Sequence, residues 1–414
     1  MRTLFSGLRR EALSFQNAGV YYALLLIVAI FTVLTSAKGG LNYISGVNAA
    51  NILDQMAIVG LLAVVTTIVL ISGNFDLSVG SVAALSGAVG LALLDRYGVY
   101  IALAAALTVG LLVGLLNGVL VQVVRVNAFI VTLGTLTAVR GLLLLLTNAR
   151  TVSANSLALT NVENVYQRTP NLLPLIGIVL LGIGLVTVFR NRSELRPAAL
   201  RASVWLLIGA ALVVYGIFNP YTLVLDREVY FMFAVTIAAW LVLRFTIVGR
   251  RLYAVGGNSE AARLSGIRVN LYRIGALVLS GVAAAFAGTM YAARIGAVTP
   301  DAMTGMELTV LAAAILGGTS LFGGFGSVIK SIVGTAILFT LANGFNVMNL
   351  GSNYQGLIQG AVIITAATIY TASGRAASHV RRGTARPTSV AASPSSGLEA
   401  PPSSNQGVQQ ARRA

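Results

Sequence analysis

Apolar segments about as long as a membrane is thick recur along the whole chain, and they constrain the fold more than any other feature. An α-helix rises about 1.5 Å per residue, so it needs about 20 apolar residues to cross a hydrocarbon core roughly 30 Å thick. Twelve such spans are predicted, at 20–37, 51–72, 79–94, 99–122, 128–147, 171–189, 203–218, 229–248, 273–292, 306–320, 327–345 and 354–371. They predict an all-α integral membrane protein, a polytopic bundle of about 10–12 transmembrane helices.

The composition agrees with lipid as the main solvent and excludes several kinds of chemistry. Only 10% of the residues are charged and 57% are hydrophobic, whereas a soluble domain is roughly a quarter charged. The chain has no cysteine and a single histidine, His379, which excludes thiolate catalysis, disulfides and His/Cys metal sites. We therefore expect neither an enzyme nor a bound cofactor.

The basic residues indicate how the chain is oriented in the bilayer. The net charge is +16, but the arginines gather in loops between spans and near the C-terminus, which is typical of a cytoplasmic rim and not of a nucleic-acid surface. With the N-terminus inside, the three most basic stretches, 190–201, 250–268 and 381–382, all fall inside as well. The pattern predicts that both termini are cytoplasmic.

Three parts follow from these patterns. Residues 1–19 form a short cytoplasmic N-terminus, and residues 20–374 form the transmembrane domain. Residues 375–414 are rich in Ser, Pro, Ala, Gln and Arg, and such a sequence cannot bury enough apolar surface to offset the entropy of ordering. We expect this last part to be a disordered cytoplasmic tail that is solvated or lies against the lipid surface.

A polar, glycine-rich break separates the second and third predicted spans, from Ile71 to Ser81. Asp76 lies within it, and a charge at the bilayer centre costs roughly 2.5–3.5 kcal/mol on insertion scales. Asp76 is therefore expected either to cap the third span, as Ser78 could, or to line a polar path.

A second glycine-rich break runs from Leu316 to Val328. It is not a nucleotide-binding loop, because that motif has a glycine directly before its lysine, whereas Lys330 follows Ile329. If ATP drives this protein, a separate subunit must bind the nucleotide.

The loop at 249–272 predicts a short helix at one membrane surface. Gly256 and Gly257 can form a turn, Asn258 or Ser259 can cap the helix, and Gly266 can end it. A helix of barely two turns is marginal in water and needs a surface to pack on. Ala261 and Leu264 share one face and offer an apolar contact.

These stretches together resemble a known family. The loop from Tyr253 to Gly266, the Asp76–Ser81 segment, the Phe129–Gly134 segment and the Gly317–Ser320 segment are similar, in this order, to the ribose/xylose-type sugar permeases of ATP-binding-cassette (ABC) importers. The resemblance covers residues 20–372, and the extra span near 203–218 is similar to that of the longer, xylose-type members.

The resemblance implies a function and partners. The chain would be the permease subunit of a pentose importer in the bacterial plasma (inner) membrane, present as a homodimer, driven by a separate ATPase subunit and supplied by an extracytoplasmic sugar-binding protein. The residues expected to dock on the ATPase are Gly257, Asn258, Ser259, Glu260, Ala261, Ala262, Arg263 and Gly266.

Sugar hydroxyls favour neutral hydrogen-bonding partners, and this gives a candidate path. Its residues are Asp76, Ser78, Asn117, Thr132, Asn343 and Asn346. Contacts between helices are the alternative role for these polar side chains. The rival function is an ion-coupled secondary transporter, which would use buried acids, with Asp76 and Glu307 as the only candidates.

Overall fold

The computed structural model describes five stretches of the chain and a few isolated positions. These are residues 15–37, 43–154, 173–190, 195–219 and 224–349, with positions 356, 357, 360, 361 and 364. Most of the predicted span at 354–371, the predicted tail at 375–414 and residues 1–14 lie outside them.

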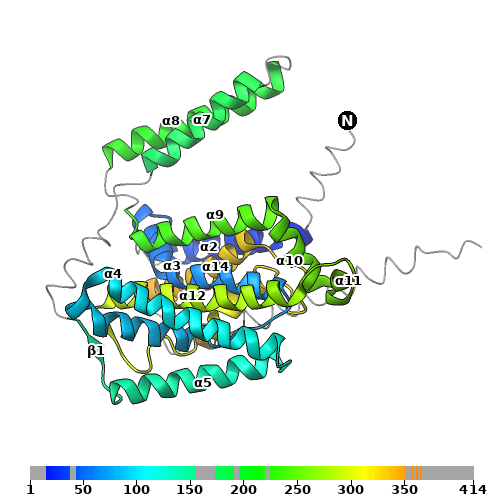
Figure 1. Ribbon diagram of the computed structural model, residues 1–414. Helices are drawn as coiled ribbons and strands as arrows, with labels where there is room; N and C mark the ends of the chain where they lie inside the picture. Colours follow the sequence, from blue (N-terminus) through cyan, green and yellow to red (C-terminus); the bar gives the residue numbers. More distant parts are fainter. Residues whose placement is uncertain are drawn as a thin grey trace, which may run out of the picture. The chain divides into compact units, whose positions relative to one another are not determined.

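The described residues are almost entirely helical (Figure 1), which confirms the predicted all-α fold. The helices are α2 (Phe15–Ala37), α3 (Gly46–Ile71), α4 (Val79–Gln122), α5 (Ala128–Thr147), α7 (Leu173–Arg190), α8 (Leu195–Phe218), α9 (Arg227–Phe245), α10 (Ile247–Gly257), α11 (Ser259–Leu264), α12 (Val269–Ile295), α13 (Met306–Leu316) and α14 (Val328–Val347). Two strands that were not expected, β1 (Val152–Ser153) and β2 (Ala297–Val298), pair antiparallel. Strands of two residues are too short to show an alternating sequence pattern.

Seven helices in the described part of the chain are long and apolar enough to cross a membrane: α2, α3, α4, α5, α9, α12 and α14. The 44-residue α4 contains two of the predicted spans, which meet at Gly98, where φ is 76° and ψ is 173°. Shorter apolar helices at Ser203–Phe218 and Met306–Leu316 coincide with two further predicted spans.

Glycines allow α4 and α12 to pack with their backbones close together. A β-carbon on Gly110 would overlap the carbonyl oxygen of Gly281, and one on Gly281 would overlap that of Gly110. One turn further along α4, a β-carbon on Gly114 would lie 2.7 Å from the Leu277 carbonyl oxygen. The four-residue glycine spacing in α4 therefore serves close helix packing.

The bundle has a buried centre and an apolar exterior. In α3 most side chains from Met56 to Ile71 are buried. By contrast α2 and α5 expose large apolar side chains, among them Leu25, Leu26 and Leu145. An outer surface of this kind suits contact with lipid chains and not with water.

Candidate functional site

The two glycine-rich breaks meet each other at one end of the bundle. The Gly324 amide donates a hydrogen bond of 2.9 Å to the Ile71 carbonyl oxygen. Gly73, Gly323 and Gly324 all have positive φ, at 81°, 86° and 71°, a conformation that glycine adopts without steric cost. Segments about 250 residues apart in the sequence are thereby joined through their main chains.

The end of α10 fills the remaining space at this meeting point. A β-carbon on Gly256 would overlap the Ile71 carbonyl oxygen and would lie 2.6 Å from the Gly324 nitrogen. The predicted turn at Gly256 and Gly257 is wrong, because both residues belong to α10. Glycine is needed here for close approach of backbones. We call the contact of residues 71–73, 256–257 and 323–324 the glycine junction.

Side chains fasten the glycine junction from two sides. The Tyr253 hydroxyl donates to the Gly326 carbonyl oxygen at 2.9 Å. Burial raises the pKa of Tyr253, and the positive charge of Arg244 partly opposes this rise. From α12, Arg273 Nε donates to the Ser72 carbonyl oxygen at 3.2 Å.

Next to the glycine junction lies α11, the short helix that the sequence predicts. Asn258 caps it by accepting a hydrogen bond of 3.0 Å from the Ala261 amide, and Gly266 follows its end with φ of 79°. The sequence predicts Asn258 or Ser259 as the cap, and Asn258 takes this role. Gly266 ends the turn as predicted. Ala262 is buried against Val255 and Val269, which is the surface that such a short helix requires.

The other face of α11 is open. Glu260, Ala261 and Arg263 are exposed, and the Leu264 side chain is 83% exposed. The predicted pair of apolar residues, Ala261 and Leu264, thus faces outward. An apolar side chain flanked by an acid and a base is suited to contact with another protein.

Four polar side chains from the first glycine-rich break, α4 and α5 form a continuous hydrogen-bonded chain. Asp76 Oδ1 accepts from the Ser78 amide at 2.9 Å and from the Ser78 hydroxyl at 2.6 Å. Asn117 Nδ2 donates to Ser78 Oγ at 3.1 Å, and the Thr135 hydroxyl donates to Asn117 Oδ1 at 2.6 Å. We call these residues the Asn117 network.

The Asn117 network tests the predicted capping roles. Asp76 does accept the backbone amide of Ser78 at the start of α4. The predicted cap by the Ser78 side chain is wrong, because that side chain makes no capping hydrogen bond. Its hydroxyl donates to Asp76 instead.

The remaining residues of the candidate path do not join this network. Thr132 is fully buried and donates to the Ala128 carbonyl oxygen of its own helix. Asn343 is buried on α14, and its Oδ1 has no partner among the described residues. Asn346 is exposed. Thr135 was missed, although its position one turn after Thr132 could have indicated it.

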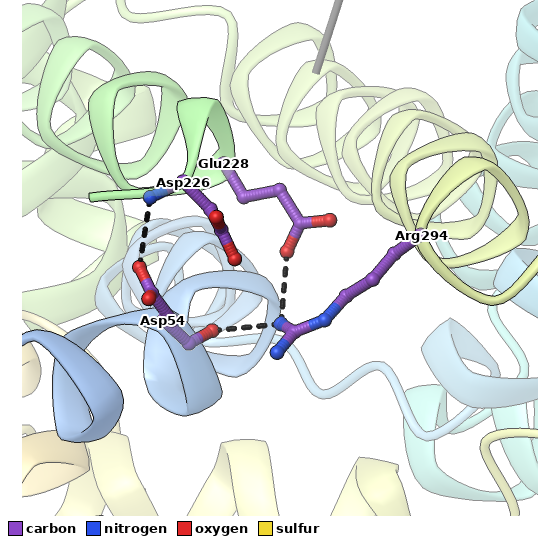
Figure 2. Close-up of polar contacts among 4 residues, drawn as sticks. All are labelled: Asp54, Asp226, Glu228 and Arg294. Atoms are coloured by element: carbon purple, nitrogen blue, oxygen red, sulfur yellow. Dashed lines mark hydrogen bonds and ion pairs between the residues drawn. The ribbon is translucent and has the colours of Figure 1, made fainter. Parts of the chain in front are cut away.

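A second polar cluster ties α3, α9 and α12 together (Figure 2). Arg294 Nη1 lies 3.1 Å from Glu228 Oε2 and donates to the Asp54 carbonyl oxygen at 2.9 Å. The Asp226 amide donates to Asp54 Oδ1 at 3.0 Å.

This cluster corrects the expectation that Asp76 and Glu307 are the only buried acids. Asp54 is 5% exposed and Glu228 is 1% exposed, whereas Glu307 is only partly buried. The sequence pattern missed them because each lies within a few residues of a predicted span end, where an acid is expected to reach water. Among the described residues, no group of His, Cys, Asp and Glu side chains could hold a metal ion.

Known proteins are similar in sequence to most of this chain. A family model described as a branched-chain amino acid transport system permease component matches residues 48–367. The xylose transport system permease protein XylH of Escherichia coli (strain K12) is 35% identical over 386 residues, which cover 90% of this chain and 95% of the relative. The ribose import permease protein RbsC of the same strain is 35% identical over 348 residues, 84% of this chain and 91% of the relative.

A further relative is also a xylose permease. The XylH protein of Haemophilus influenzae is 34% identical over 367 residues, covering 86% of this chain and 97% of the relative. No solved structure matches the chain. The helical bundle, the apolar exterior and these matches lead to one conclusion: the chain belongs to the family of ABC-transporter permease components that includes the xylose and ribose permeases.

Proposed function

We propose that this chain forms the transmembrane path of an ATP-driven importer for a pentose, with xylose as the first candidate. The relatives named above are xylose and ribose permeases, and they align over nearly their whole length. The observation that carries the proposal is the open face of α11 beside the glycine junction.

A separate ATPase subunit would dock on that face. Its contact residues would be the exposed members of the predicted set, among which Glu260 and Arg263 supply charge. Leu264, which is not in that set, would add an apolar anchor. Movement of α11 would pass through Gly256 to Ile71 and Gly324, and therefore to α3, α13 and α14. Backbones in direct contact transmit displacement because packed interiors are hard to compress.

The remaining parts of the assembly follow from the same proposal. An extracytoplasmic binding protein would deliver the sugar, two copies of the chain would line the path, and both termini would lie in the cytoplasm of a bacterial cell. Asp76, Ser78 and Asn117 would be path residues of each copy, because together they present hydroxyl, amide and carboxylate groups within one buried network. Groups of these types suit sugar hydroxyls.

Reconstituted transport tests this function. The chain would be placed in liposomes with its ATPase subunit and binding protein, and ATP-dependent uptake of labelled xylose, ribose and hexoses would be measured. Glu260→Lys reverses the charge on the docking face and should lower uptake at least tenfold while the protein still inserts. Arg150→Glu, which reverses the charge of an exposed residue between α5 and β1, is the control and should leave uptake nearly unchanged.

Two results would contradict the proposal. One is normal ATP-dependent uptake by the Glu260→Lys variant, which would remove the docking role of α11. The other is sugar uptake at the full rate without any ATPase subunit. That second result would favour an ion-coupled secondary transporter.

A further inference from the structure

A large cavity opens beside α11, and its charge is of one sign. It has a volume of about 870 Å³ and lies where the end of α4, the start of α5, the start of the first glycine-rich break and the start of α12 come together. Four arginines line it, Arg125, Arg263, Arg268 and Arg273, and its lining contains no Asp or Glu. We call it the arginine cavity.

Most of these arginines have guanidinium N–H donors that are not used by the described residues. The side chains of Arg125, Arg263 and Arg268 make no hydrogen bond or ion pair with any residue that the structure describes, and all three are exposed. Arg273 uses its Nε on the Ser72 carbonyl oxygen, which leaves its remaining donors available. Four like charges around one cavity repel each other unless an anion sits among them.

The main chain and one buried amide add to this positive field. Both α5 and α12 begin at the wall of the arginine cavity, at Ala128 and Val269, and the N-terminal end of a helix favours an anion. Asn74, which also lines the cavity, is 3% exposed, and its Nδ2 has no hydrogen-bond partner among the described residues. The described residues thus supply no acceptor for this donor group.

An apolar rim distinguishes this cavity from a site for a free anion. Around the α4–α5 corner, Val123, Val124, Phe129 and Ile130 are between 51% and 62% exposed, and Phe129 also lines the cavity. A small soluble anion has no apolar surface that could pack on such a rim. Two acyl chains attached to a phosphate group would cover it.

We propose that the arginine cavity binds the headgroup of an anionic phospholipid, with the phosphodiester among the arginines and the acyl chains over the apolar rim. Basic pockets between transmembrane helices are suited to anionic headgroups, and arginine matches the geometry of phosphate oxygens. A bound lipid would connect Arg263 on α11 with Arg125 at the α4–α5 corner. The binding itself does not depend on the proposed transport function.

Native mass spectrometry of the purified full-length chain tests this proposal. The protein would be offered phosphatidylglycerol or phosphatidylcholine, and we expect at least tenfold more bound phosphatidylglycerol. The Arg263→Gln/Arg268→Gln variant should lose this preference. The Arg244→Gln/Arg250→Gln variant removes the same charge from two exposed positions outside the cavity lining and should retain it.

Inorganic phosphate separates the lipid from a soluble anion. Competition of millimolar phosphate with phosphatidylglycerol should be weak, because phosphate cannot cover the apolar rim. If phosphate displaced all of the bound phosphatidylglycerol, the proposal that the ligand is a lipid would be wrong. Equal binding of the two lipids, equal losses in both double variants, or occupation of the cavity by an acidic segment of a partner protein would also overturn it.

Discussion

Gly256 lies against the main-chain carbonyl of Ile71 so closely that a side chain of any size would overlap it. This contact places the end of α10, and with it α11, directly on the end of α3. Because Ile71 also accepts the hydrogen bond of Gly324, three segments share one carbonyl group. A force applied to α11 therefore reaches two different parts of the bundle through one point.

Replacement of Gly256 by alanine tests the glycine junction. The new methyl group would collide with Ile71 and Gly324, and overpacking of this kind costs about 1–3 kcal/mol. We expect a lower melting temperature in detergent and reduced ATP-dependent uptake. Gly257→Ala is the matched control for the melting temperature, because its β-carbon would meet only the Gly324 Cα at 3.9 Å. Equal melting temperatures of the two variants would show that the close contact is not needed for stability.

The Asn117 network gives a second prediction. Asn117→Ala removes the hydrogen bonds to Ser78 and Thr135, and the loss of both should lower the free energy of unfolding by about 1–2 kcal/mol. Thermal unfolding of the purified protein measures this. Asn346→Ala, at an exposed position in α14, should change stability little. If the two variants are equally stable, the Asn117 network does not contribute to the free energy of unfolding, and the prediction is wrong.

The pair of Arg294 and Glu228 gives a third prediction. Arg294→Met leaves the Glu228 carboxylate buried without its partner, which costs about 3–5 kcal/mol in a fully buried pair. We expect the lower end of this range, because the Arg294 side chain is 32% exposed. Adding Glu228→Gln should restore part of the lost stability, since burial of a neutral amide costs less free energy than burial of a carboxylate. Thermal unfolding that shows no recovery in the double variant would contradict this explanation.

Much of the fold could be predicted because the bilayer demands long apolar helices. The spans near 51–72 and 128–147 agree with α3 and α5 to within five residues at each end. Asn258 as the cap of α11 was also predictable, because capping depends on residues only three apart. The family was predicted from short motifs, and the matches to the xylose and ribose permeases confirm the family.

The rest depends on contacts between distant segments, which local patterns do not contain. The glycines at 256 and 257 have the sequence pattern of a turn, but close packing against Ile71 and Gly324 places them in α10. The position of Thr135 one turn after Thr132 does not identify Asn117 as its partner, and Arg294 has no local signal for Glu228. The arginine cavity likewise exists only because four helix ends and loops converge.

Site-specific cross-linking from α11 tests the docking of an ATPase subunit most directly. The chain has no cysteine, so Ala261→Cys provides a single thiol on the exposed face of α11, and Tyr100→Cys provides one at a residue that is 89% exposed in the second half of α4. Each variant would be labelled with a photoactivatable maleimide in native membranes, and the captured chain would be identified by mass spectrometry and assayed for ATP hydrolysis. We expect an ATP-hydrolysing chain to be captured from position 261 and not from position 100. Capture of that chain from position 100 alone, or of no ATPase from position 261, would contradict it.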